Sequence, residues 1–214
     1  MDDATRNKIF AFEWSTKDLA KFNLKLLNMR RLGATTGEIS KYLDDISELK
    51  GLQNSEKFVT KIEEANTLDN FKSLAFEADR AAHFKRLCKN IVIEPDIKNR
   101  IDLKVNEEFI EQKASNGAIT EGKIKDMIGK TEGKFGDKTV KGIVGDSPTK
   151  LEISAREGLG NMDINSIKNR IYDYMRSRAM NNRPNYIQKI EIFLPDGSSI
   201  IGNWDNTLAS FIWS

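Results

Sequence analysis

The side chains of this sequence best suited to metal-assisted chemistry are the carboxylates of Asp102 and Glu111, which could hold a metal ion, and the ammonium group of Lys113 beside them. Carboxylates that face each other across a strand pair repel, so two of them in that position indicate a compensating charge. A divalent cation provides it, because hard ions such as Mg²⁺ are bound by one or two carboxylates together with phosphate oxygens. The adjacent ammonium group suits a water molecule or a phosphate. We therefore predict a site for metal-assisted phosphate chemistry, which requires that the three side chains share one face.

A β-hairpin over residues 101–115 would bring them to one face. Apolar and polar residues alternate from Ile101 to Val105, and a second extended run follows from residue 108 to residue 115. Asn106-Glu107 is the expected two-residue turn. Because paired residues share a face and side chains alternate, Lys113 then lies beside Glu111, whereas Gln112 points to the other face and is expected to be structural. The predicted register pairs Val105 with Glu108, Leu103 with Ile110 and Asp102 with Glu111.

The segment before the hairpin supplies a helix and a strand. Apolar residues at helical spacing predict a helix from Leu68 to Leu87, which carries Glu77, and Ile91-Val92-Ile93 reads as a short buried strand. The predicted order is helix, strand, strand, strand, with Glu111-Gln112-Lys113 in the third strand.

This order, with Asp102 and Glu111-Gln112-Lys113, resembles the PD-(D/E)xK nuclease superfamily of metal-dependent phosphodiesterases. The resemblance implies an α+β (α/β/α-like) fold, with a restriction-endonuclease-like mixed sheet flanked by helices over residues 67–214. It implies Asp102, Glu111, Lys113 and Glu77 as catalytic residues. Mg²⁺, or Mn²⁺ or Zn²⁺, would be held by Asp102 and Glu111 with Glu77 as an additional helical carboxylate. Asp96, in the literal Pro95-Asp96, competes with Asp102; we favour Asp102 because it alone falls opposite Glu111.

Residues 1–66 contain no proline and read as a separate helical module. The expected helices follow a capping signal at 15–18, a cap at Thr36 and a start near Ser55. A helix-turn-helix around Gly33 is disfavoured, because its second helix is acidic on the exposed face and would repel phosphate.

The whole architecture resembles the C-terminal nuclease toxin domains of bacterial contact-dependent growth inhibition and related polymorphic toxins, whose helical module serves entry into the target cell. That resemblance implies a DNA or tRNA substrate and a cognate immunity protein. It also implies action in the cytoplasm of the attacked cell after secretion or delivery as part of a larger protein. Two alternatives stay open: a phage or restriction-type DNA-processing endonuclease, and a non-enzymatic adaptor that keeps the fold. In the adaptor, Glu111 and Lys113 would be an ordinary exposed ion pair, worth well under about 1 kcal/mol.

The C-terminal half is expected to contain loops, one clear helix and a hairpin. Residues 129–160 are rich in glycine, lysine, aspartate and threonine and predict mobile loops with one or two short strands. The helix at 163–179 has a basic face, which is either a surface for the nucleic-acid backbone or an ordinary solvated face. A hairpin is predicted from residues 187–194 and 199–204. The candidate backbone contacts on the helix are Lys168, Tyr172, Arg176 and Arg178.

Composition excludes several classes of protein. The 214 residues carry a net charge of +2, too small to mark a nucleic-acid binder by itself. Cys88 is the single cysteine and His83 the single histidine, which excludes an internal disulfide and argues against a Cys/His zinc site. No apolar run is long enough to span a bilayer, so we expect no stable membrane association. The sequence does not choose between DNA and RNA.

Overall fold

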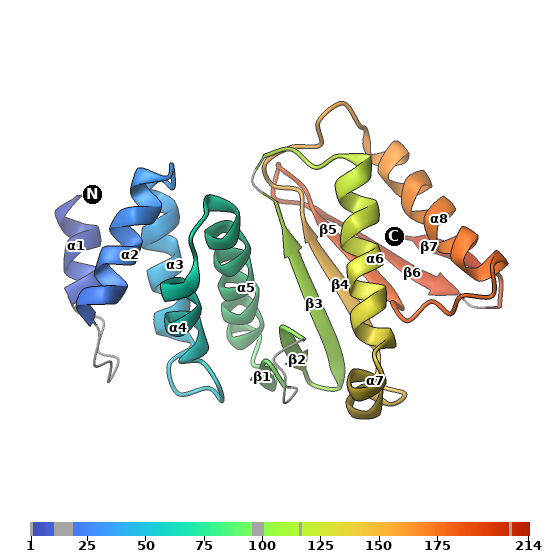
Figure 1. The fold of residues 1–214 in the computed structure, drawn as a ribbon, viewed down its shortest axis with the longest axis horizontal. Helices are drawn as coiled ribbons and strands as arrows, with labels where there is room; N and C mark the ends of the chain where they lie inside the picture. The colour runs from blue at the N-terminus through green and yellow to red at the C-terminus, as the bar shows by residue number, and fades with distance from the viewer. Residues whose placement is uncertain (1, 11–18, 96–100, 116, 206) are drawn as a thin grey trace. The chain divides into compact units, whose positions relative to one another are not determined.

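The computed structural model describes residues 2–10, 19–95, 101–115, 117–205 and 207–214 (Figure 1). The chain is an N-terminal helical region followed by a mixed seven-strand sheet with interspersed helices, so the predicted α+β fold is confirmed. The residues form two compact units, 1–93 and 94–214. In the described part of the chain, no helix is both long enough and apolar enough to cross a membrane.

The first unit contains five helices and one short strand among its described residues: α1 (Asp3–Phe10), α2 (Leu19–Arg31), α3 (Thr36–Glu48), α4 (Lys57–Glu64), α5 (Leu68–Arg86) and β1 (Ile91–Ile93). The helix α3 is capped by Thr35 and not by Thr36. The Thr35 hydroxyl accepts a hydrogen bond from the Glu38 backbone N–H, and the Glu38 carboxylate accepts one from the Thr35 N–H, a reciprocal capping box. The capping signal predicted at 15–18 lies outside the described residues.

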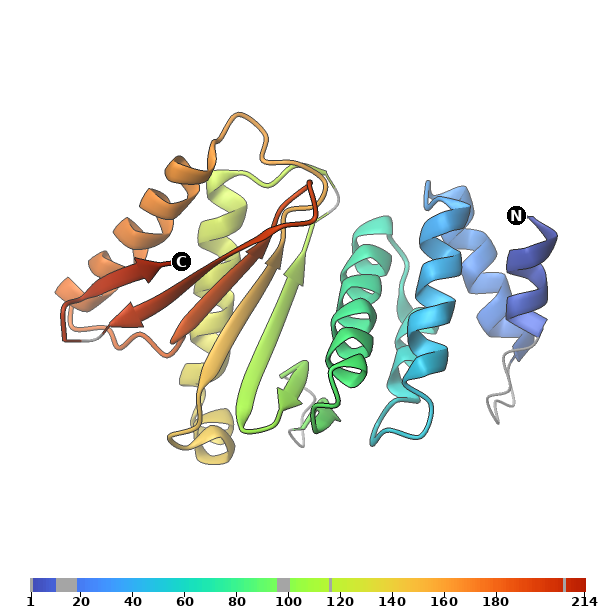
Figure 2. The same ribbon diagram turned by 180° about the vertical axis from the view of Figure 1, so that it is seen from behind.

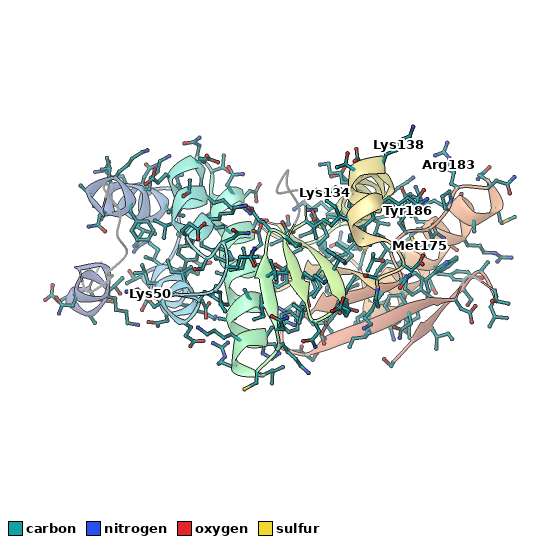
Figure 3. All side chains as sticks on the ribbon, turned by 90° about the horizontal axis from the view of Figure 1, so that it is seen from below. Lys50, Lys134, Lys138, Met175, Arg183 and Tyr186 are labelled. Atoms are coloured by element: carbon teal, nitrogen blue, oxygen red, sulfur yellow. The ribbon has the colours of Figure 1, made fainter. Side chains whose placement is uncertain are left out.

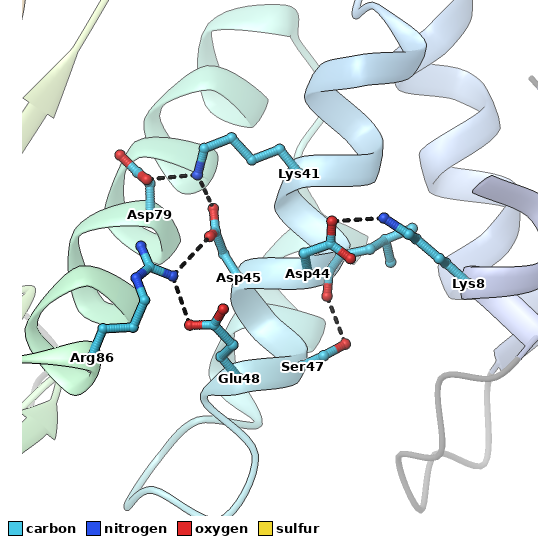
Figure 4. A network of polar contacts seen from close by, with 9 residues as sticks. Lys8, Lys41, Asp44, Asp45, Ser47, Glu48, Asp79 and Arg86 are labelled. Carbon is cyan, nitrogen blue, oxygen red and sulfur yellow. Dashed lines mark hydrogen bonds and ion pairs between the residues drawn. The ribbon is translucent and has the colours of Figure 1, made fainter. Parts of the chain in front are cut away.

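The helix α5 packs against α3 and α4 within the first unit. Tyr42 on α3 donates a 2.7 Å hydrogen bond to the Phe58 carbonyl and meets the Phe71 ring edge-on. On the surface, Lys41 on α3 bridges Asp45 and Asp79 at 2.6 Å each, as Figure 4 shows. These contacts group α5 with the N-terminal helices, and the chain divides into its two compact units at 93/94; the domain boundary expected at 66/67 stays a prediction.

The second unit holds the other six strands and three helices of the described chain: β2 (Leu103–Val105), β3 (Glu108–Ala114), α6 (Glu121–Gly136), α7 (Lys138–Val144), β4 (Thr149–Ser154), α8 (Ile164–Met180), β5 (Lys189–Phe193), β6 (Ser199–Asp205) and β7 (Ser210–Trp213). The strands follow one another in the sheet in chain order. The strand β4 is parallel to both β3 and β5, whereas β2–β3, β5–β6 and β6–β7 are antiparallel. Both α6 and α8 lie on one face of these strands (Figure 1), and the view from behind shows the opposite face (Figure 2).

The mobile loops predicted within residues 129–160 are not found over residues 129–144, whereas one of the short strands predicted there is present as β4. The helix α6 continues to Gly136, residues 140–144 lie in α7, and β4 is a buried strand between two parallel neighbours. Two glycines of α6 are explained by close packing: a Cβ at Gly129 would lie 3.0 Å from the Tyr174 hydroxyl oxygen, and one at Gly136 only 2.7 Å from the Tyr186 ring. Glycine in this segment therefore permits close helix packing, although glycine usually signals a loop.

The main core of the second unit lies between the sheet and the helices α6 and α8. Apolar residues of β4 and β5 contact the buried stripes of both helices. The predicted C-terminal hairpin is present as β5 and β6, and β7 adds a strand that the sequence did not predict. Phe211 packs on both Trp204 and Trp213, with ring centroids 5.5 and 5.3 Å apart.

Candidate functional site

The hairpin that holds the candidate site has the predicted register. Val105 pairs with Glu108 and Leu103 with Ile110, and the chain reverses at Asn106-Glu107. Asn106 has φ +53°, in the left-handed region that asparagine tolerates better than most residues. The turn therefore fixes which side chains share a face.

Asp102 lies just before β2, one step beyond the last recorded pair, which places it across from Glu111. Its Oδ2 accepts a 2.7 Å hydrogen bond from the backbone N–H of Gln112. The Asp102 carboxylate is thereby tied to the strand that carries Glu111 and Lys113.

The Glu111 carboxyl group is the centre of the site. Its residue is fully buried, and its Oε1 accepts hydrogen bonds from the ammonium groups of Lys113 and Lys134. Its Oε2 is buried and has no hydrogen-bond partner among the described residues. Burial, and then the nearby Asp102 charge, raise the pKa of Glu111 to about 7, although the two lysines act in the opposite direction.

Lys134 is a site residue that sequence reasoning missed. It lies near the end of α6, on the side next to β3 (Figure 3), and its side chain is 33% exposed whereas that of Glu111 is 1% exposed. The loops predicted from residue 129 onwards could not place it. The usable signal was the apolar spacing of Ile124, Ile128 and Phe135, which continues the helix through its glycines.

The donor set at Asp102 and Glu111 fits a hard divalent cation. It offers carboxylate oxygens, one of which is buried without a hydrogen bond, although the two ammonium groups on the other Glu111 oxygen oppose a bound cation electrostatically. In residues 2–10, 19–95, 101–115, 117–205 and 207–214, no group of three or more His, Cys, Asp or Glu could hold a metal ion. Two carboxylates alone would leave most positions around a bound ion to water or phosphate oxygens, which is how Mg²⁺ is commonly held.

Neither of the other two predicted metal ligands is among the described residues of the second unit. Glu77 belongs to α5 in the first unit, where its carboxylate accepts a 3.0 Å hydrogen bond from Lys61. Asp96 lies outside the described residues. The structure thus brings together Asp102, Glu111 and Lys113 and adds Lys134.

The candidate backbone contacts on α8 divide into two groups. Lys168, Tyr172 and Arg176 follow at four-residue intervals along one stripe, where Arg176 donates a 3.1 Å hydrogen bond to the Tyr172 hydroxyl. Arg178 instead bonds the buried Glu132 at 3.1 Å and the Pro184 carbonyl at 2.8 Å. Arg178 therefore ties α8 to α6 and to the segment before β5.

Gln112 faces away from Glu111, as predicted, and enters a buried polar ladder across the sheet. Its Nε2 donates a 2.8 Å hydrogen bond to Glu152 on β4. The Lys150 ammonium group on β4 binds Glu152 on the same strand and Glu191 on β5. The Ser199 hydroxyl on β6 donates a 2.8 Å hydrogen bond to Glu191. This buried polar ladder consists of Gln112, Lys150, Glu152, Glu191 and Ser199. Its two carboxylates are paired with the Lys150 ammonium group, which indicates a structural role.

Comparisons of this chain with protein-family models, curated proteins and solved structures give no match. The site chemistry is accordingly judged from the side chains themselves. A buried carboxylate with a raised pKa, a second carboxylate and two partly exposed lysines form a cluster that can bind a divalent cation and an anionic oxygen side by side.

Proposed function

We propose that the protein is a metal-dependent endonuclease that hydrolyses phosphodiester bonds of DNA or tRNA at Asp102, Glu111 and Lys113. The observation that carries this proposal is the fully buried Glu111 carboxylate, which lies near Asp102 and accepts from two lysines on one oxygen. Removing such charges from water is unfavourable, and hydrophobic residues often stabilise a fold as well or better. A functional requirement for the charges explains why the fold retains them.

The order of elements supports the same proposal. Helix α5, the strands β1, β2 and β3, and Glu111-Gln112-Lys113 in the third strand follow the order described for the PD-(D/E)xK nuclease superfamily. The agreement extends to the hairpin register, because Asp102 falls across from Glu111. Glu77 on α5 stays a proposed additional carboxylate of this site.

Each residue has a proposed role in the hydrolysis. Asp102 and Glu111 would hold Mg²⁺ or Mn²⁺. The bound ion would lower the pKa of a water molecule and compensate the negative charge on the phosphate. Lys113 would orient the attacking water and stabilise the negative charge that develops on the phosphate oxygens. The hydrogen bond from the Gln112 backbone N–H to Asp102 keeps the Asp102 carboxylate at a fixed position on the hairpin.

The narrower proposal is that the chain is a bacterial antagonistic toxin that acts in the cytoplasm of the attacked cell and is neutralised by an immunity protein. It is supported by the helical region ahead of the sheet-containing unit. Expression in bacteria tests it: the wild-type chain should arrest growth, and Glu111→Gln should relieve the arrest. Wild-type expression without any growth defect contradicts the toxin proposal and leaves a phage or restriction-type enzyme.

Incubation of the purified chain with plasmid DNA and, separately, with total tRNA tests the nuclease itself. We expect cleavage of one substrate in Mg²⁺ and none in EDTA, and the substrate that is cut identifies the target. The absence of cleavage of both substrates in Mg²⁺ and in Mn²⁺ would contradict the proposal and favour a non-enzymatic adaptor.

A further inference from the structure

We propose that Lys134 on α6 is a second phosphate-binding residue of this site and contacts the sugar-phosphate backbone of the nucleic acid together with Lys113. The inference rests on the proposed nuclease function and names a residue outside the Glu111-Gln112-Lys113 segment. Its starting point is that Lys113 and Lys134 donate to the same oxygen, Glu111 Oε1.

The charges of the cluster indicate an anionic ligand. Asp102 and Glu111 contribute two negative charges, and Lys113 and Lys134 two positive charges, so the four side chains sum to zero when all are ionised. A divalent cation held by the two carboxylates brings the cluster to a charge of two plus. A phosphodiester group, which is negative and gains charge during hydrolysis, has the matching sign. Lys134 is therefore one of the positively charged groups that would contact a bound phosphate.

The exposure of Lys134 makes it accessible to such a ligand. Its side chain is 33% exposed, and that of Lys113 is 21% exposed, whereas the Glu111 side chain is 1% exposed. Both lysine side chains are thus partly exposed to solvent, although their ammonium groups contact a carboxylate that is buried. A lysine stem can keep its methylene groups packed while its ammonium group contacts a ligand at the surface.

The other lysines of α6 have different surroundings. Lys130, one turn before Lys134, forms a 2.7 Å ion pair with Asp126 on the exposed surface of the same helix. Lys123 donates to the Ser115 hydroxyl at 2.6 Å and to the Ala118 carbonyl at 3.1 Å. Lys134 is thus distinguished by its contact with Glu111 on β3, and Lys130 is a matched control on the same helix.

The salt dependence of nucleic-acid binding tests the proposal without any need for cleavage. Fluorescence anisotropy with labelled duplex DNA and labelled tRNA in Ca²⁺, which supplies the divalent charge that the cluster needs, gives the slope of log K against log salt concentration. Each phosphate contact that is lost reduces this slope by about 0.9 for duplex DNA and by about 0.7 for a single strand. We expect that reduction in Lys134→Gln, no change in Lys130→Gln, and the wild-type slope in Lys134→Arg. A merely structural role of Lys134 would leave the slope unchanged.

A second measurement uses the wild-type chain and does not depend on whether the variants fold. Acetylation of lysines, mapped by mass spectrometry, should be slowed at Lys134 by bound nucleic acid and unaffected at Lys130. Equal modification of Lys134 with and without nucleic acid, or an unchanged slope in a folded Lys134→Gln, overturns the inference. Protection of Lys134 in a chain that cuts neither DNA nor tRNA supports the phosphate contact and contradicts the nuclease function. Cleavage without protection of Lys134 supports the nuclease function and contradicts the phosphate contact.

Discussion

Asp102 accepts a hydrogen bond from the backbone N–H of Gln112 at 2.7 Å, so a side chain outside β2 is anchored to the centre of β3. The bond extends the hairpin beyond its last recorded strand pair and holds the Asp102 charge near Glu111. Two carboxylates that repel each other are thus kept together by the backbone, a geometry suited to a divalent cation.

Asp102→Asn should remove the negative charge of this residue and keep its hydrogen bond. The asparagine Oδ1 can accept the same bond from Gln112, so the hairpin should persist. Since the Asp102 charge helps to raise the pKa of Glu111 to about 7, that pKa should fall in the variant. Loss of one carboxylate should also weaken Mn²⁺ binding by roughly 10- to 100-fold or more. Carboxyl NMR titration and calorimetry measure the two effects, and an unchanged Glu111 pKa would show that the two carboxylates do not interact.

Glu111 should make the stability of the chain fall as pH rises in metal-free buffer. Its pKa is about 7 in the folded chain and 4.5 as the ordinary value, so its protonated form is favoured by folding. The associated stability is fully present below pH 4.5 and is lost as pH rises through 7, a change of up to about 3 kcal/mol. Glu111→Gln should lack this change. Urea denaturation of both chains between pH 4.5 and 8 measures it, and parallel pH profiles would contradict the raised pKa.

Lys150→Met should destabilise the fold by about 3–5 kcal/mol, because it leaves the buried carboxylates of Glu152 and Glu191 without their shared cation. Although burial disfavours the charged form, Glu152 and Glu191 hold the pKa of Lys150 above its ordinary value. Lys130→Met, at an exposed pair, should change stability by less than about 0.5 kcal/mol. Equal denaturation midpoints for the two variants would show that the polar ladder does not stabilise the sheet.

Two glycine substitutions should have opposite effects. At Gly202 on β6, a Cβ would lie 2.7 Å from Phe211 and 2.8 Å from Trp213, so Gly202→Ala should cost about 1–3 kcal/mol by overpacking. At Gly133 in α6 a Cβ would have no neighbour within 4 Å, so Gly133→Ala should stabilise the helix by about 0.5–1 kcal/mol. Thermal unfolding followed by tryptophan fluorescence compares them, and a stabilised Gly202→Ala would mean that the β6–β7 packing is not tight.

The local parts of the fold were predictable from sequence, because their signals lie within a few residues. The alternation from Ile101 to Val105 with the turn at Asn106 gave the correct hairpin register, and the apolar spacing after Leu68 gave α5. The α6–α7 region was mispredicted because Gly129 and Gly136 serve contacts with Tyr174 and Tyr186, which lie 45 and 50 residues further along the chain.

The candidate site was predictable only where it lies within the hairpin. Asp102, Glu111 and Lys113 follow from the strand register, whereas Lys134 comes from a helix whose packing on β3 has no local signature. Arg178 illustrates the same limit, because its binding to Glu132 depends on how α8 packs on α6. Whether a basic residue on a helix faces solvent or binds a buried carboxylate depends on contacts between segments that lie far apart in the sequence.

The most direct test of the central claim is the single-turnover rate of cleavage in Mg²⁺ by wild-type chain and by Glu111→Gln, with Lys130→Gln as a control for the loss of one surface charge. Glutamine keeps the size of the side chain but removes the charge that holds the cation, so the rate should fall by at least about 100-fold, while Lys130→Gln cuts like wild type. A Glu111→Gln chain that is folded and cuts at the wild-type rate would show that hydrolysis does not take place at this hairpin.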